Sequence, residues 1–86
     1  MFNMKYITEK ECPALKPYSF GDQYPTCHLK TSDISCSLGA NSEKQLKDII
    51  NIMPNNTRAV VLYNLEVYLV FKYVENAYLV TKVIDI

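Results

Sequence analysis

The chain has 86 residues, of which 49% are hydrophobic and 21% are charged, and its 9 basic side chains balance its 9 acidic ones. This length supports one domain, and the hydrophobic fraction argues against a disordered chain. A zero net charge lacks both the basic footprint typical of nucleic-acid binding and the acidity of a DNA mimic.

Residues 1–25 are predicted to form an irregular, aromatic-rich N-terminal segment. Prolines and single glycines interrupt any regular pattern at short intervals. The aromatic side chains are too numerous for a solvated linker, so we expect the segment to pack over the rest of the domain. These aromatic residues are Phe2, Tyr6, Tyr18, Phe20 and Tyr24.

Residues 26–38 alternate between apolar and polar side chains, which predicts a β-hairpin. The turn would fall at Thr31-Ser32 and would set Cys27 opposite Cys36 on the apolar face. Because Thr-Ser is not a favoured two-residue turn, the prediction rests on the alternation alone.

Residues 42–53 are predicted to form the helix of the domain. Ser42 followed three residues later by Gln45 is the capping-box pattern of a helix start, and Pro54 ends the helix. Apolar residues follow at the spacing of a single helix face. They are Leu46, Ile49, Ile50 and Met53.

Residues 58–86 are rich in Val, Ile, Tyr and Phe, which predicts a three-strand antiparallel meander. Asn64 and Glu75-Asn76 interrupt the apolar run at the spacing of hairpin turns. Alternation places apolar side chains on both faces of these strands, and one helix of this length covers only one face. One face carries Leu62, Val67, Leu69, Phe71 and Tyr73, and the face that we expect the helix to leave uncovered carries Val61, Tyr63, Tyr68, Val70 and Val74.

Together these elements predict a small single α+β domain over residues 1–86. Its antiparallel sheet follows the order ββαβββ, with one helix packed on one face. The second face must then be covered by residues 1–25 or by a second subunit.

The candidates for a metal site or a thiol nucleophile are Cys12, Cys27, His28 and Cys36. On a strand, Cys27 and His28 point to opposite faces, so the histidine cannot activate the adjacent thiol. The spacing C-x14-C-H-x7-C also lacks the closely spaced cysteine pair of strong zinc motifs. We therefore expect no metal ligand. An odd number of cysteines without a recognisable signal peptide predicts reduced thiols and a cytoplasmic location.

No glycine-rich phosphate loop and no H-E-x-x-H, G-x-S-x-G or EF-hand pattern is present in the sequence. The sequence therefore predicts a protein that is not an enzyme and that binds no cofactor. Charged residues also break the apolar runs well before the roughly 20 residues that a membrane span requires.

Tyrosine is the most suggestive residue type, with 7 in the chain and no tryptophan. It combines apolar area with a polar tip, which suits protein-binding surfaces but also the rims of ordinary sheets. The predicted partner-binding residues are Tyr63, Tyr68 and Val70 of the meander together with Tyr18, Phe20 and Tyr24 of the N-terminal segment. We expect them to bind another protein, or a second copy in a homodimer, through a sheet face or edge.

The functional hypothesis is a non-enzymatic protein-binding module that acts as an intracellular inhibitor or adaptor. Richness in Asn, Ile, Lys and Tyr is typical of AT-rich genomes such as those of phages and mobile elements. An inhibitor of a host enzyme or defence system, acting in the host-cell cytoplasm, is the specific form of this hypothesis. The alternatives are a small nucleotide- or RNA-binding domain and a non-catalytic subunit of a larger enzyme.

Overall fold

The computed structural model of the protein describes residues 24–35, 37–75 and 77–84. Two short strands and a 3-10 turn precede the helix, and three longer strands follow it. In chain order the elements are β1 (Thr26–His28), η2 (Thr31–Asp33), β2 (Leu38–Ala40), α1 (Glu43–Ile52), β3 (Thr57–Tyr63), β4 (Glu66–Val74) and β5 (Ala77–Ile84).

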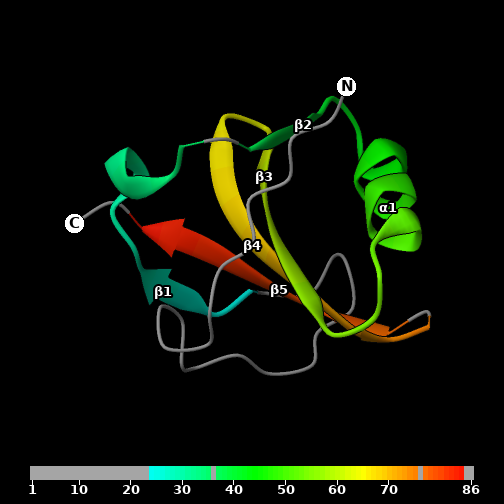
Figure 1. Cartoon of the computed structure of the whole chain (residues 1–86). Coiled ribbons are helices and arrows are strands. Elements are labelled where there is room, and N and C mark those ends of the chain that lie inside the picture. The colour runs from blue at the N-terminus through cyan, green and yellow to red at the C-terminus, as the bar shows by residue number, and fades with distance from the viewer. Residues whose placement is uncertain (1–23, 36, 76, 85–86) are drawn as a thin grey trace.

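The five strands form one sheet in the order β1-β5-β4-β3-β2, with α1 beside it (Figure 1). β4 pairs with both β3 and β5 in antiparallel register, as the meander prediction requires. β1 is parallel to β5 and β2 is parallel to β3, so the sheet is mixed rather than antiparallel. The α+β class, the element order and the three-strand meander are therefore confirmed, and only the arrangement of the two edge strands differs.

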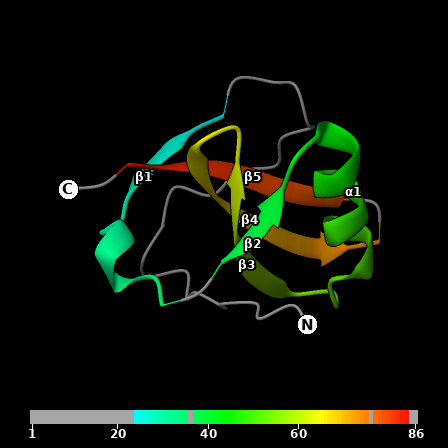
Figure 2. The ribbon, with the colours of Figure 1, turned by 90° about the horizontal axis from the view of Figure 1, so that it is seen from above.

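The predicted hairpin over residues 26–38 is wrong. β1 and β2 lie at opposite edges of the sheet, and Figure 2 shows β1 beside β5 and well apart from β2. Cys27 pairs with Val83 of β5, and Thr31–Asp33 forms a 3-10 turn instead of a hairpin turn. Cys36, the predicted partner of Cys27 across the hairpin, lies outside the described residues. The alternation of this segment is satisfied by strands far away in the sequence, which a local pattern does not reveal.

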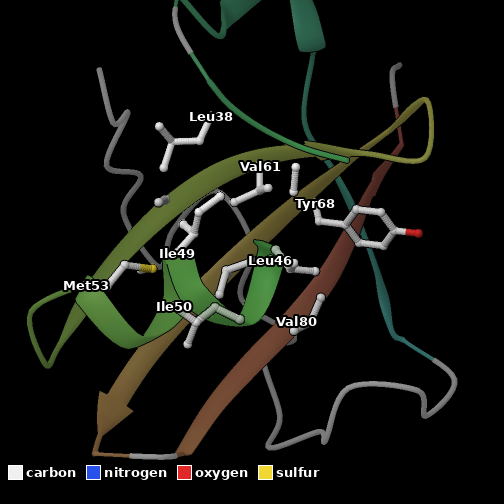
Figure 3. Packing of buried hydrophobic residues seen from close by; sticks show 11 residues of the cluster. Leu38, Leu46, Ile49, Ile50, Met53, Val61, Tyr68 and Val80 are labelled. Atoms are coloured by element: carbon white, nitrogen blue, oxygen red, sulfur yellow. The ribbon is translucent and has the colours of Figure 1, made fainter. Parts of the chain in front are cut away.

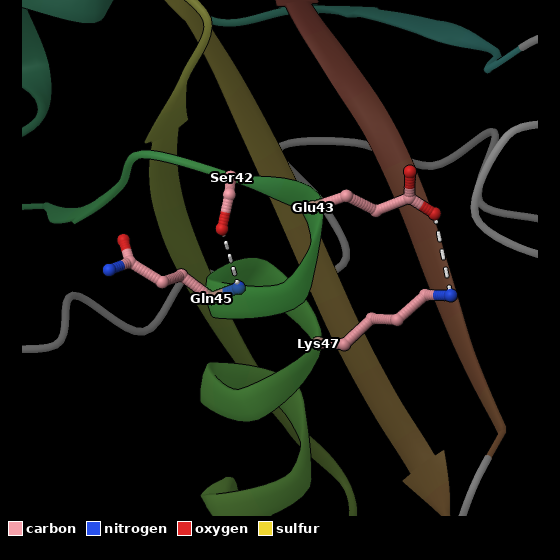
Figure 4. Close-up of polar contacts among 4 residues, drawn as sticks. All are labelled: Ser42, Glu43, Gln45 and Lys47. Carbon is pink, nitrogen blue, oxygen red and sulfur yellow. Dashed lines mark hydrogen bonds and ion pairs between the residues drawn. The ribbon is translucent and has the colours of Figure 1, made fainter.

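The helix prediction is confirmed, with Ser42 as N-cap and Met53 as C-cap of α1. The Ser42 hydroxyl accepts a hydrogen bond from the Gln45 backbone N–H at 3.2 Å (Figure 4). The Gln45 side-chain oxygen in turn accepts one from the backbone N–H of Asn41 at 2.8 Å. The first bond satisfies a backbone donor that the first helical turn leaves unpaired, and the second pairs the backbone N–H of the residue before the N-cap.

The face of the sheet beneath α1 carries the larger core cluster, part of which is seen in Figure 3. The helix contributes Leu46, Ile49, Ile50 and Met53, and the sheet contributes Leu38, Ala40, Ala59, Val61, Tyr68, Val70 and Val80. The expectation that the helix leaves the face of Tyr68 and Val70 uncovered is therefore wrong. Alternation identifies the side chains that share a face, but it does not say which face the helix covers.

The opposite face of the sheet is also buried. Its cluster consists of Cys27, Val60, Leu69 and Val83, and the partly buried side chains packed against it are Leu29, Ile34 and Val67. Leu29 and Ile34 come from the connection between β1 and β2, so this connection covers part of the second face. The expected cover by residues 1–25 falls almost entirely outside the described residues.

Lys72 of β4 is buried and links the sheet to the helix. Its ammonium donates a hydrogen bond to the backbone carbonyl of Asn51 at 2.9 Å, in the last turn of α1. A cation at this position complements the negative end of the helix dipole and satisfies a carbonyl that the helix itself leaves unpaired. Lys72 therefore links the end of α1 to the sheet.

Candidate protein-binding surface

Three of the predicted partner-binding residues come together at one end of the helix-facing side of the sheet. The rings of Tyr24 and Tyr68 meet edge to face, with centroids 5.5 Å apart and planes at 77°. The rings of Tyr63 and Tyr68 are tilted by 51°, with centroids 6.2 Å apart. We call Tyr24, Tyr63 and Tyr68 the tyrosine cluster.

The cluster brings a residue from near β1 together with two residues of the β3–β4 hairpin. Tyr24 lies just before β1, Tyr63 ends β3, and Tyr68 lies in β4 beside the hairpin that joins β3 to β4. Figure 3 shows the Tyr68 ring extending beyond α1 with its hydroxyl outermost. The helix therefore covers one part of this sheet face, and the cluster occupies the next part.

An acid–base pair fixes the central ring of the cluster. The Tyr68 hydroxyl donates to the Glu66 carboxylate at 2.7 Å, and the Lys82 ammonium contacts the other oxygen of that carboxylate at 2.8 Å. The Glu66 and Lys82 side chains are both partly exposed, so this ion pair adds little to stability. Its main effect is to hold Tyr68 in one orientation.

The same contacts set the protonation states of the cluster. Hydrogen bonds from Lys82 and then from Tyr68 hold the pKa of the Glu66 carboxyl below its usual value. Burial, and then the hydrogen bond to Glu66, raise the pKa of the Tyr68 phenol. At neutral pH the phenol is therefore a firmly protonated donor and the carboxylate a weak base, which suits a fixed binding surface better than proton transfer.

The three rings differ in how much surface they offer. Tyr68 is only 7% exposed, whereas Tyr24 and Tyr63 are half-buried. Val70 lies fully buried beneath α1 and offers no surface in this structure. Tyr18 and Phe20, the other predicted contact residues, lie outside the described residues.

The candidate thiol and metal residues do not form a site in the described structure. Cys27 is disulfide-bonded, which contradicts the expectation of three reduced thiols and removes its thiolate as a ligand or nucleophile. His28 lies on the other face of β1 and is exposed. Cys12 and Cys36 lie outside the described residues. Within the described ranges, no three His, Cys, Asp or Glu side chains gather closely enough to hold a metal ion.

A second surface, which sequence reasoning missed, surrounds β2 at the edge of the sheet. A groove of about 390 Å³ lies where β2 meets α1, lined by Gly39, Gln45, Asp48, Ile49 and Ile52. A groove of about 280 Å³ lies at the β3–β4 turn and is lined by Gly39, Ala40, Asn41, Leu62, Asn64 and Leu65. Gly39 lines both.

The β3–β4 turn at this surface has an unusual backbone. Asn64 and Leu65 form a two-residue connection, and both have positive φ, at 53° and 62°. This is the pattern of a type I′ turn, whose second position favours glycine. The Leu65 side chain is 96% exposed. In the sequence, this turn is indicated only by Asn64 followed by Leu65, in place of the usual glycine, between two alternating runs.

Comparison of the chain with protein-family models, with curated proteins and with solved structures finds no match. No helix in the described part of the chain has both the length and the apolar composition that a membrane crossing requires.

Proposed function

We propose that the protein is a non-enzymatic protein-binding module whose contact surface is the tyrosine cluster. The observation that carries the proposal is that Tyr24 and Tyr63 stand half-buried around Tyr68, whose hydroxyl is fixed by Glu66. Rigid, amphipathic rings lose little side-chain entropy on binding, and tyrosine is enriched among the residues that dominate interface energies.

An inhibitor or adaptor is the form of this function that suits the chain best. A small domain whose sequence carries no catalytic motif can act by covering a surface of its partner. The composition typical of AT-rich genomes supports a phage or mobile-element protein that antagonises a host enzyme or defence system. We place its action in the cytoplasm. The disulfide at Cys27 weighs against that location, since disulfides persist mainly in oxidising compartments.

The nucleic-acid alternative gains no specific support from the geometry. The two lysines of the meander are both engaged, since Lys82 pairs with Glu66 and Lys72 is buried against the end of α1. Phosphate binding requires cations that face outward along one surface.

Affinity capture with matched variants tests the proposed function. The native protein, Tyr63→Glu and Tyr73→Glu are each used as bait in nuclease-treated lysate of the cells in which the protein occurs. Tyr73 is a suitable control because it is a half-buried tyrosine of β4 that stacks on Phe71, away from the cluster. We expect a protein that the native chain and Tyr73→Glu retain and that Tyr63→Glu loses. Equal retention by all three baits, or capture that nuclease abolishes, would reject the proposal.

A further inference from the structure

We propose that the outer edge of β2 accepts an extended segment of a partner protein, which pairs with β2 as an added strand of the sheet. This surface goes beyond the tyrosine cluster, and its test is independent of that cluster. The proposal rests on the position of β2, on the two grooves that meet at Gly39, and on the exposed apolar side chains around them.

β2 is the last strand of the sheet, and within the described residues its only strand partner is β3. An edge strand carries backbone N–H and C=O groups on its outer side that another extended backbone can pair with. Gly39, the middle residue of β2, is exposed, and a Cβ placed on it would have no atom within 4 Å. An incoming backbone therefore meets no side chain at this position.

The two grooves lie where side chains of an added strand would point. Successive side chains of a strand alternate between the two faces of a sheet. One groove lies towards the helix-covered face, with Ile49 and Ile52, and the other lies at the turn of β3 and β4, with Leu62 and Leu65. An added strand could thus place consecutive side chains in the two grooves.

The exposed apolar side chains of the described structure concentrate around this edge. Of the five large hydrophobic residues that stand exposed, Ile52 (64%), Leu62 (43%) and Leu65 (96%) line the grooves beside β2, and Val74 and Ile84 do not. Leu65 also has a φ of 62°, a backbone conformation that is unfavourable for leucine. Exposed apolar residues that gather on one edge are typical of an interaction site.

The occupant that fits these grooves is a segment of a different protein rather than a second copy through the same edge. A second β2 would present Gly39, which has no side chain, and Leu38 and Ala40, which are buried in its own core. It would fill neither groove. The partner segment therefore carries apolar side chains at consecutive positions. Asp48 also lines the helix-side groove. A basic residue of the partner segment, two positions from the apolar residue that enters this groove, would point to the same face and complement the Asp48 charge.

The test selects peptides from a phage-displayed library of random linear 12-residue sequences against the purified full chain. The best-enriched peptide is synthesised with a fluorophore, and its affinity is measured by anisotropy for the native protein and for variants. Ile52→Asp should weaken binding about tenfold or more, because it places a charge in an apolar groove. Val74→Asp is the matched control, since it changes another exposed apolar residue, which lines neither groove, and it should alter affinity less than about twofold.

Three further measurements complete the test. Leu65→Gly should weaken peptide binding, although we expect it to stabilise the fold, so that unfolding cannot explain the loss. Tyr24→Glu should leave peptide affinity within about twofold, which separates this surface from the tyrosine cluster. In ¹H–¹⁵N NMR spectra the peptide should shift the backbone amide signals of Leu38, Gly39 and Ala40.

The proposal is overturned if no peptide is enriched, if Ile52→Asp and Val74→Asp bind alike, or if the peptide shifts amide signals away from β2. It is also overturned if sedimentation shows that the native chain is a dimer and that Ile52→Asp dissociates it, because the edge would then serve self-association. A failure here with intact partner capture through Tyr63 would reject the β2 site alone.

Discussion

Replacing Leu65 by glycine should stabilise the protein. Leu65 occupies the second position of a two-residue turn at a φ of 62°, where an L-residue with a Cβ costs roughly 1–2 kcal/mol. Its side chain is 96% exposed, so truncation removes almost no buried apolar area. Glycine adds freedom to the unfolded chain, which offsets about 0.5–1 kcal/mol. The net gain should be about 0.5–1 kcal/mol.

Thermal and urea melts of the native protein and Leu65→Gly measure this gain. For a domain of this size it corresponds to a rise in Tm of roughly 2–8 °C. Leu65→Ala is the matched control, because it removes the same side chain but keeps the Cβ that causes the strain, so its stability should stay within about 0.5 kcal/mol of the native value. A destabilised Leu65→Gly, or an alanine variant that gains as much as the glycine variant, would refute the reasoning.

Four further outcomes follow from buried or coupled groups. Lys72→Met should cost about 1–2 kcal/mol in urea melts, because the Asn51 carbonyl loses its donor; an unchanged midpoint would contradict this. Thr81→Val should add about 1 kcal/mol, since Thr81 is fully buried and its hydroxyl is unpaired; a loss of stability would show that the hydroxyl is bonded. Non-reducing intact mass should show the loss of two hydrogens that the disulfide at Cys27 requires, and complete thiol labelling would exclude it. Because burial raises the pKa of Tyr68 above 10.0, the folded chain keeps a proton that the unfolded chain loses. Stability should therefore fall as the pH rises above about 10, and a Tyr68→Phe variant with the same fall would contradict this.

The helix and the meander can be predicted from the sequence because their signals are local. Ser42 and Gln45 lie within one turn of each other and form the cap that their spacing predicts. Asn64 lies in the turn that joins two adjacent strands. The edge strands cannot be predicted in this way, because Cys27 pairs with Val83 and Gly39 with Leu62, across most of the domain or across the helix. No local pattern specifies such a parallel pairing.

The tyrosine cluster is predictable in its members but not in its setting. Tyr24, Tyr63 and Tyr68 can be chosen from residue type, yet only the fold shows that Tyr68 is buried beside α1 and that Tyr24 and Tyr63 remain partly exposed around it. The ion pair of Lys82 with Glu66 is likewise not predictable, because the sequence shows only a charge that interrupts an apolar strand. Such contacts depend on strand register, which sets the side chains that meet.

Two unfavourable features of the fold differ in what they imply about function. Thr81 buries an unpaired hydroxyl, and Leu65 holds a leucine where glycine fits better, so each lowers the stability of the domain. Thr81 is fully buried, so no partner can reach its hydroxyl and binding cannot offset the stability that the unpaired hydroxyl loses. Leu65 projects almost its whole side chain outward beside β2, whose outer edge pairs with no other strand of the described residues. A partner that covers this side chain would remove its apolar surface from water. Accessibility therefore makes Leu65, and not Thr81, the residue whose replacement should raise stability and lower binding together.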